Sequence, residues 1–197
     1  MFCLRIGELS RKTYETDVNV KINLDGSGKY NIDTGIGFLN HMLCMIAKHG
    51  MTDLDIAAKG DLNVDFHHTM EDVGIVMGKC IKDSLGDKKN IKRYGTFFIP
   101  MDESLSMVSI DLSGRPYLVF DADFKTEKVG QMDTELVEEF FRAVAFNAEM
   151  TLHIKVIYGK NTHHMIEGIF KAFGHALKEA VSIDSSINGI MSTKGTI

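Results

Sequence analysis

An internal repeat constrains the fold of this 197-residue chain more than any other feature. The segment DFHHTMED at 65–72 is echoed by NTHHMIE at 161–167, and the two His-His pairs lie 96 positions apart, close to half the chain length. Self-similarity at a fixed spacing is typical of duplicated structural units. We therefore expect two similar half-domains, residues 1–92 and 93–197, packed as one globular unit.

The bulk composition agrees with a single packed unit and excludes several classes of protein. Hydrophobic content is 44%, charged content is 25%, and only two prolines occur, so no linker is marked. A net charge of −5 argues against a nucleic-acid or membrane surface as the main partner but allows a small anionic substrate. The N-terminus lacks the apolar run of a signal peptide, and the three cysteines show no metal-type spacing. We expect a cytoplasmic protein without membrane spans.

Alternation and helical periodicity predict the same order of elements in both halves. In the first half we expect a β-hairpin within 11–33, a helix over 38–49 capped by Gly50, a strand within 51–64 and a helix over 72–85. In the second half we expect strands at 94–99, 104–112 and 116–124, a helix at 136–150, a strand at 151–158 and a helix at 166–181. The predicted class is α+β, with a four-stranded sheet packed on helices in each half.

The His-His motif has the spacing of a metal site. In a helix, His67 and Glu71 are separated by four residues and His68 and Glu71 by three, so an imidazole and a carboxylate can share a face. Adjacent histidines are rotated by about 100° around a helix axis, so both rings do not readily serve one ion. One such motif could be a solvated helix N-terminus. Two copies favour two neighbouring metals shared between the motifs.

Aligning the helix at 38–52 with the helix at 136–151 pairs His41 with Glu139 and completes the candidate ligand set. The eight candidates are His41, His67, His68, Glu71, Glu139, His163, His164 and Glu167. Imidazoles mixed with carboxylates, without thiolates, indicate a divalent ion such as Mn, Fe, Co, Ni or Zn. Two sites of four ligands each would leave open positions on a six-coordinate ion such as Mn²⁺.

Scattered basic residues suggest a second function. Arg93, Arg115, Lys171 and Lys194 would form a phosphate clamp if the fold gathers them, and they are ordinary solvated charges if it does not. The tail segment STKG at 192–195 equally suits an anion or a frayed terminus.

Several segments together resemble the imidazoleglycerol-phosphate dehydratase family. They are TGIGFLNHML at 34–43, DFHHTMED at 65–72, GRPY at 114–117, GKNTHHMIEGIFKAF at 159–173 and STKG at 192–195, and the similarity covers nearly the whole chain in order. The resemblance implies a hydro-lyase of histidine biosynthesis that converts imidazole glycerol phosphate to imidazole acetol phosphate. It also implies a fold like domain 2 of ribosomal protein S5, two Mn²⁺ per active site, and a 24-chain assembly with sites at subunit interfaces.

The resemblance further implies roles for individual residues. One metal would be held by His41, His68, His163 and Glu167, and the other by His67, Glu71, Glu139 and His164, with ligands shared between neighbouring subunits. The phosphate would be bound by Arg93, Arg115, Lys171, Ser192 and Lys194, and His49 would lie near the substrate. Glu15 would be an acid/base, and the catalytic side chains would be Glu15, His67 and Glu167.

This sequence departs from the commoner family pattern at four positions. Glu139 replaces a frequent histidine, Asn40 a frequent aspartate, Met45 a frequent glutamine and Met191 a frequent proline. A carboxylate can bind Mn²⁺, so we expect Glu139 to alter the ligand set and the affinity more than the function.

The ligand set suits the implied reaction. The proton to be removed lies on a carbon with no adjacent carbonyl, so a carboxylate alone is a poorly matched base. A metal on the imidazole favours the imidazolate, which can expel the neighbouring hydroxyl through a diazafulvene, and Glu15 would add general acid/base help. The alternatives are a two-metal hydrolase and a metal-storage or metal-stabilised assembly protein. No role is predicted for His153 or Glu103.

Overall fold

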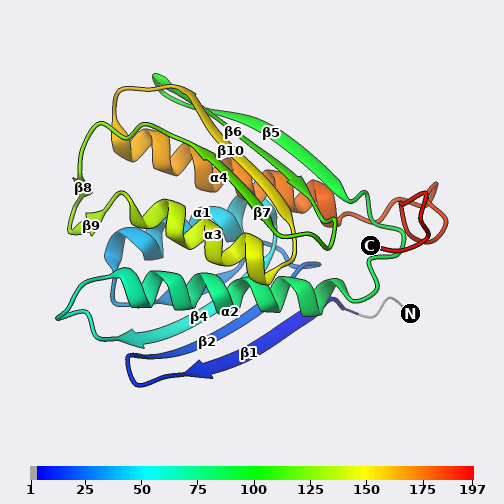
Figure 1. Ribbon diagram of the computed structural model, residues 1–197, viewed down its shortest axis with the longest axis horizontal. Coiled ribbons are helices and arrows are strands. Elements are labelled where there is room, and N and C mark those ends of the chain that lie inside the picture. Colours follow the sequence, from blue (N-terminus) through cyan, green and yellow to red (C-terminus); the bar gives the residue numbers. More distant parts are fainter. Residues whose placement is uncertain (1–3) are drawn as a thin grey trace.

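The computed structural model describes residues 4–197, and in this range two four-stranded sheets enclose four helices (Figure 1). The first half comprises β1 (Ile6–Lys12), β2 (Thr16–Asn23), β3 (Tyr30–Asp33), α1 (Gly37–Gly50), β4 (Asp53–Gly60) and α2 (His67–Leu85). The second comprises β5 (Tyr94–Met101), β6 (Ser104–Asp111), β7 (Tyr117–Asp121), a small hairpin of β8 (Lys128–Val129) and β9 (Met132–Asp133), α3 (Leu136–Asn147), β10 (Thr151–Tyr158) and α4 (Thr162–Val181).

The two large sheets share one topology. Their strand orders are β1-β2-β4-β3 and β5-β6-β10-β7. In each sheet the last pair, β3 with β4 and β7 with β10, is parallel and is joined through a helix, as parallel neighbours require. The predicted α+β class with a four-stranded sheet and helices in each half is confirmed, and the predicted division at residues 92 and 93 falls in the connection between α2 and β5.

The predicted hairpin within 11–33 is wrong. The hairpin is formed by β1 and β2, and β4 lies between β2 and β3. β4 pairs with β2 along eight residues and buries Leu54, Ile56 and Ala58, whereas β3 has four mostly exposed residues. The strand with the apolar face therefore takes the central position, and the polar strand lies at the edge.

The helices join the halves. α2 packs on β1 and β2, α4 packs on β5 and β6, and across the middle α1 packs on α4 while α2 packs on α3 (Figure 1). The phenylalanines Phe140, Phe141, Phe170 and Phe173 are fully buried in this helical layer. Burial of these large aromatic side chains stabilises the helical layer, and this layer packs the two halves on each other.

Both helices that carry the motif begin earlier than predicted. α2 starts at His67 instead of 72 and α4 at Thr162 instead of 166, so each His-His pair lies in a first helical turn. The predicted cap at Gly50 is also corrected, because the left-handed residue that ends α1 is Met51, with φ of 52°. Gly50 instead permits a close helix contact, since a Cβ there would lie 3.2 Å from the carbonyl oxygen of Gly174.

The remaining boundaries agree to within a few residues, although the alternation first noted at residue 11 missed β1. Cys80 is buried and Cys44 half-buried, as small apolar residues would be, and Cys3 lies outside the described residues. None of the helices in 4–197 is long and apolar enough to cross a membrane.

Candidate functional site

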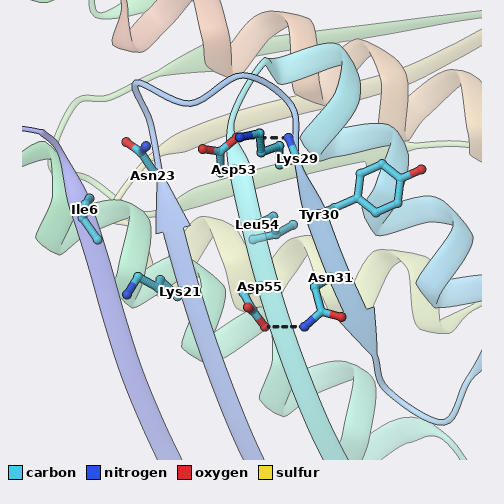
Figure 2. Close-up of a pocket in the computed structure, with 9 residues that line it drawn as sticks. All are labelled: Ile6, Lys21, Asn23, Lys29, Tyr30, Asn31, Asp53, Leu54 and Asp55. Atoms are coloured by element: carbon cyan, nitrogen blue, oxygen red, sulfur yellow. Dashed lines mark hydrogen bonds between the residues drawn. The ribbon is translucent and has the colours of Figure 1, made fainter.

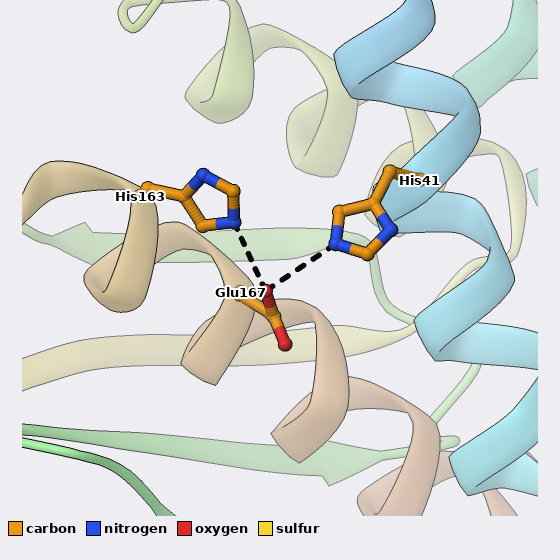
Figure 3. Close-up of side chains that lie close together, drawn as sticks. All are labelled: His41, His163 and Glu167. Atoms are coloured by element: carbon orange, nitrogen blue, oxygen red, sulfur yellow. Dashed lines mark hydrogen bonds and ion pairs between the residues drawn. The ribbon is translucent and has the colours of Figure 1, made fainter.

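Three of the predicted ligands converge where α1 meets α4 (Figure 3). The Nε2 atom of His41, from α1, lies 3.4 Å from Oε2 of Glu167, and Nε2 of His163 lies 3.1 Å from the same oxygen. One ligand atom from each residue lies within 4.8 Å of the other two. We call His41, His163 and Glu167 the His-His-Glu cluster.

Local sequence explains two of these three positions. Asn161 caps α4 by accepting hydrogen bonds from the backbone N–H groups of His163 and His164, so the histidines lie in the first turn. Glu167 follows His163 by four residues and therefore shares its helix face. Only the packing of α1 on α4 brings His41 to them.

Lys171 neutralises the carboxylate of the cluster. Its Nζ lies 2.6 Å from Oε1 of Glu167, whose side chain is only 9% exposed. Burial acts to raise the pKa of Glu167, but the hydrogen bond from Lys171 and those with His163 and His41 outweigh it and hold the pKa below its ordinary value. The carboxylate is thus ionised, with Oε2 directed at the two imidazoles.

This donor set fits a divalent metal ion. Two imidazole nitrogens and a carboxylate oxygen converge, and no thiolate is among them. The ion pair with Lys171 on the same helix holds the Glu167 carboxylate in one orientation. The cluster is therefore a possible metal-binding group of the type expected for Mn, Fe, Co, Ni or Zn.

The second histidine of each motif is held by a carboxylate outside the motif. Nδ1 of His68 lies 3.0 Å from Oδ2 of Asp61, and Nδ1 of His164 lies 2.7 Å from Oε2 of Glu103. Glu103 also accepts hydrogen bonds from the backbone N–H groups of Lys160 and Asn161. A carboxylate on Nδ1 fixes the ring and its tautomer and leaves Nε2 to bind a metal.

These contacts change the protonation of the partners. Hydrogen bonds from Asn161, from His164 and from Lys160 lower the pKa of Glu103 to about 2. The hydrogen bond with Glu103 raises the pKa of His164, and the hydrogen bond with Asp61 raises the pKa of His68. In both pairs the carboxylate favours an N–H at Nδ1 of the histidine.

The other predicted ligands do not form such a group within the described chain. The ring centroid of His67 lies 6.3 Å from that of His68, Glu71 is exposed, and Glu139 forms an ion pair of 3.6 Å with Arg142. They lie on α2 and α3, which are the counterparts of α4 and α1, so His67, Glu71 and Glu139 occupy the duplicated equivalents of the cluster positions.

Most of the predicted phosphate residues gather in a second place. Arg93, Arg115, Ser192 and Lys194 line one cavity of about 610 Å³ between β5 and the C-terminal tail. Arg93 is anchored there, with Nε 2.6 Å from Oδ1 of Asp111 and Nη1 donating to the Met191 carbonyl at 2.7 Å. Lys171 is not part of this cavity, because it is bound to Glu167.

The remaining predicted residues occupy separate positions. Glu15, on the β1–β2 connection, lies 3.9 Å from Nδ1 of His68, and His49 pairs with His175. Asn40 has a local role, since its Oδ1 accepts from the Thr34 hydroxyl at 2.6 Å and from the Thr34 N–H. A further cavity of about 330 Å³ at the end of the first sheet (Figure 2) is lined by residues such as Lys21, Tyr30 and Asp53 and contains none of the predicted site residues.

Sequence reasoning gave no role to three residues that contact predicted site residues. They are Asp61, Glu103 and His175. For Glu103 a signal was available, because it lies in the β5–β6 turn, the duplicated counterpart of the β1–β2 connection that carries Glu15. Alignment of the halves would have drawn attention to it. Asp61 and His175 follow no motif, and only the fold places them.

Fold and site together define the class: a duplicated α+β protein with a His/Glu cluster of metal-binding type between its halves. Sequence comparison gives the family. The model of the imidazoleglycerol-phosphate dehydratase family matches residues 34–177. The chain is 77% identical to the imidazoleglycerol-phosphate dehydratase of Clostridium kluyveri over 194 residues, covering 98% of this chain and 100% of that one.

Solved structures agree. The imidazoleglycerol-phosphate dehydratase of Staphylococcus aureus is 50% identical and superposes with a TM-score of 0.83 over 91% of this chain and 99% of its own. The enzyme of Pyrococcus furiosus is 35% identical, with a TM-score of 0.83 over 96% of this chain and 100% of its own. The chain belongs to the imidazoleglycerol-phosphate dehydratase family and is a hydro-lyase of histidine biosynthesis.

Proposed function

We propose that this chain dehydrates imidazole glycerol phosphate to imidazole acetol phosphate in a metal-dependent reaction, with two Mn²⁺ per active site. The observation that carries the proposal is the His-His-Glu cluster, in which ligands 126 residues apart in sequence meet within hydrogen-bond distance. A protein that only stored metal would not need the separate cavity lined by Arg93, Arg115, Ser192 and Lys194, which suits the phosphate of the substrate.

The duplication supports two metals. His41, His163 and Glu167 would hold the first, and their duplicated equivalents Glu139, His67 and Glu71 the second. The fourth ligands would be His68 and His164, whose Nε2 atoms are left available by Asp61 and Glu103. We propose that these two histidines come from neighbouring subunits, in a 24-chain cytoplasmic assembly.

The chain's own residues would bind, orient and exchange protons. When bound, the metals supply positive charge at the substrate's imidazole, which eases loss of the hydroxyl and of the neighbouring proton. Arg115, Ser192 and Lys194 would bind the phosphate around the anchored Arg93, with Lys171 and His49 along the substrate. Glu15 would take the proton from the carbon or return one to the leaving hydroxyl, which is worth about 10²–10⁴-fold. The hydroxyl would leave as the substrate's ring forms a diazafulvene, and the proton of the neighbouring carbon would be lost next.

The test is removal and return of the metal. The protein is chelated, dialysed and assayed for acetol product and for inorganic phosphate, before and after Mn²⁺ is added. We expect no turnover without metal, recovery with Mn²⁺, and no phosphate release. Normal turnover of the chelated protein would contradict the metal dependence, and phosphate release would indicate a two-metal hydrolase. Light scattering with and without Mn²⁺ measures the assembly.

A further inference from the structure

A pair of histidines lies further along the α1–α4 contact than the His-His-Glu cluster. On α1, His49 is eight residues beyond His41, and on α4, His175 is eight residues beyond Glu167. Nδ1 of His49, in the last turn of α1, lies 3.3 Å from Nε2 of His175 on α4. Both side chains are half-buried. His49 has a predicted place near the substrate, whereas His175 belongs to none of the motifs.

Close helix packing holds the pair. Gly50 and Gly174, each the neighbour of one of these histidines, allow the two backbones to approach. A Cβ on Gly174 would lie 3.0 Å from the backbone nitrogen of Gly50. Phe97 of β5 stacks on the ring of His175, with centroids 5.3 Å apart and planes inclined by 25°. His175 is therefore fixed on two sides, and its Nε2 points at His49.

The pair continues the polar strip that contains the cluster. His163, Glu167, Lys171 and His175 follow one another at intervals of four on α4, and His41, Met45 and His49 do so on α1. At 1.5 Å per residue, His49 lies about 12 Å along the helix from His41. A ligand whose imidazole end lies at the cluster would extend along this strip toward His49.

The hydrogen bond limits how the pair is protonated. One facing nitrogen must carry hydrogen and the other must accept, so the two rings are not both cations. Burial lowers the pKa of His49, the nearby His175 and Lys171 lower it further, and Glu167 opposes them. Burial, together with Lys178, lowers the pKa of His175. Phe97, the group facing the pair from β5, carries no charge.

We propose that His175 is a positioning residue that fixes the ring orientation and tautomer of His49, so that Nε2 of His49 is the atom presented to the substrate. This inference rests on the proposed dehydration and adds a residue to it. A purely structural pair would stabilise the fold but leave the kinetics unchanged. A positioning pair controls how His49 meets the substrate, so its loss changes KM and the pH profile.

The experiment compares His175→Phe, which keeps the ring against Phe97 but removes the hydrogen bond, with His175→Gln, whose amide reaches the place of Nε2. Lys155→Gln, on β10 and paired with Asp121, is the control, because Lys155 acts on neither histidine. All are assayed with Mn²⁺ for kcat and KM from pH 5.5 to 8.5. The melting temperature and Mn²⁺ stoichiometry are measured in parallel.

We expect kcat/KM of His175→Phe to fall about tenfold, mainly through a higher KM, because the hydrogen bond that positions His49 is lost. Its acid limb should move to higher pH, because a neighbour that lowers the pKa of His49 is gone. His175→Gln should recover most of the loss, and Mn²⁺ stoichiometry should not change.

Wild-type kcat/KM and an unmoved acid limb in His175→Phe would overturn the inference. If His175→Phe does not fold, His175→Asn, whose amide is too short to reach His49, takes its place against His175→Gln, and equal kinetics of the two would overturn it. A wild-type protein that forms no acetol product would instead count against the proposed function.

Discussion

Nε2 of His41 lies 3.4 Å from Oε2 of Glu167, although 126 residues separate them in sequence. The contact joins a helix of the first half to a helix of the second, so the His-His-Glu cluster exists only when the halves are packed together. It ties the candidate metal site to the tertiary fold.

Replacing Glu167 with glutamine should weaken metal binding at the cluster. The amide keeps the shape but lacks the charge that a divalent ion needs, and we expect an affinity loss of at least about 100-fold. Calorimetric titration of chelated protein with Mn²⁺ measures it. Glu179→Gln, on the same helix but paired with Lys92 at 3.5 Å, is the control and should bind as the wild type does. Equal affinity of the two variants would remove Glu167 from the ligand set.

Replacing Glu103 with glutamine should loosen His164 without removing it. A carboxylate that holds a metal-binding histidine is worth about 10–100-fold in metal affinity. Asp61→Asn should act similarly, because Asp61 holds His68. Mn²⁺ titration of each variant is the measurement, with Glu8→Gln on β1 as control, since Glu8 pairs with Lys21 at 2.8 Å and with none of the candidate ligands. Unchanged affinity in both variants would mean that these carboxylates do not orient His68 and His164 for metal binding.

Replacing Arg115 with glutamine should raise KM by about tenfold or more, because a charge-assisted bond to the phosphate is lost. Its side chain is 68% exposed and lies 3.7 Å from Asp111, so little folding energy depends on it. Steady-state kinetics at low and high salt measure the effect. Lys21→Gln, an exposed cation on β2 that pairs with Glu8 and lies outside this cavity, should keep KM. A fall in kcat at constant KM would argue against a phosphate contact.

Replacing Gly95 with alanine should destabilise the protein by about 1–3 kcal/mol or more, as overpacking does. A Cβ at this position of β5 would lie 2.0 Å from the Ala176 carbonyl oxygen on α4, and Gly7 against Cys80 repeats the arrangement in the first half. Urea unfolding measures the change. Gly37→Ala is the control, because no atom lies within 4 Å of its Cβ position and the substitution should be neutral or slightly stabilising. Equal urea midpoints of Gly95→Ala and Gly37→Ala would show that β5 can move away from α4 without loss of stability.

Acidification should reduce the contribution of His49 and His175 to stability. Their folded pKa values lie below the ordinary 6.5, so the unfolded state binds more protons as pH falls through 6.5, and the free energy of unfolding decreases. His68 and His164, whose pKa values are raised, act in the opposite direction. The measured quantity is therefore the difference between wild type and His175→Phe in urea unfolding at pH 7.5 and 5.5. His175→Phe should lose less stability than the wild type on acidification, and a larger loss would contradict the assignment.

Local spacing was enough to predict several parts of the site. The pairing of His163 with Glu167 follows from helix geometry alone, because residues four apart share a face. The duplication, the order of elements and the α+β class could be read from the repeated motif and from periodicity. Family membership followed from motifs that keep their order along the chain.

Contacts between distant segments were decided by the tertiary structure. Alternation showed that β2 and β3 are strands, but their separation by β4 depended on which strand has the better apolar face. Gly50 resembled a helix cap in sequence, and the α1–α4 contact uses it instead for close packing.

The chain by itself therefore determined which residues are candidates for binding metal and phosphate and which of them are neighbours on one helix. Only the fold decided that His41 joins His163 and Glu167, that Lys171 lies with them instead of with Arg93, and that Glu103 holds His164. The physical reason is the sequence distance over which each effect acts. Helix periodicity relates residues that are four positions apart, whereas burial of the helical layer between two sheets brings together residues that are more than a hundred positions apart.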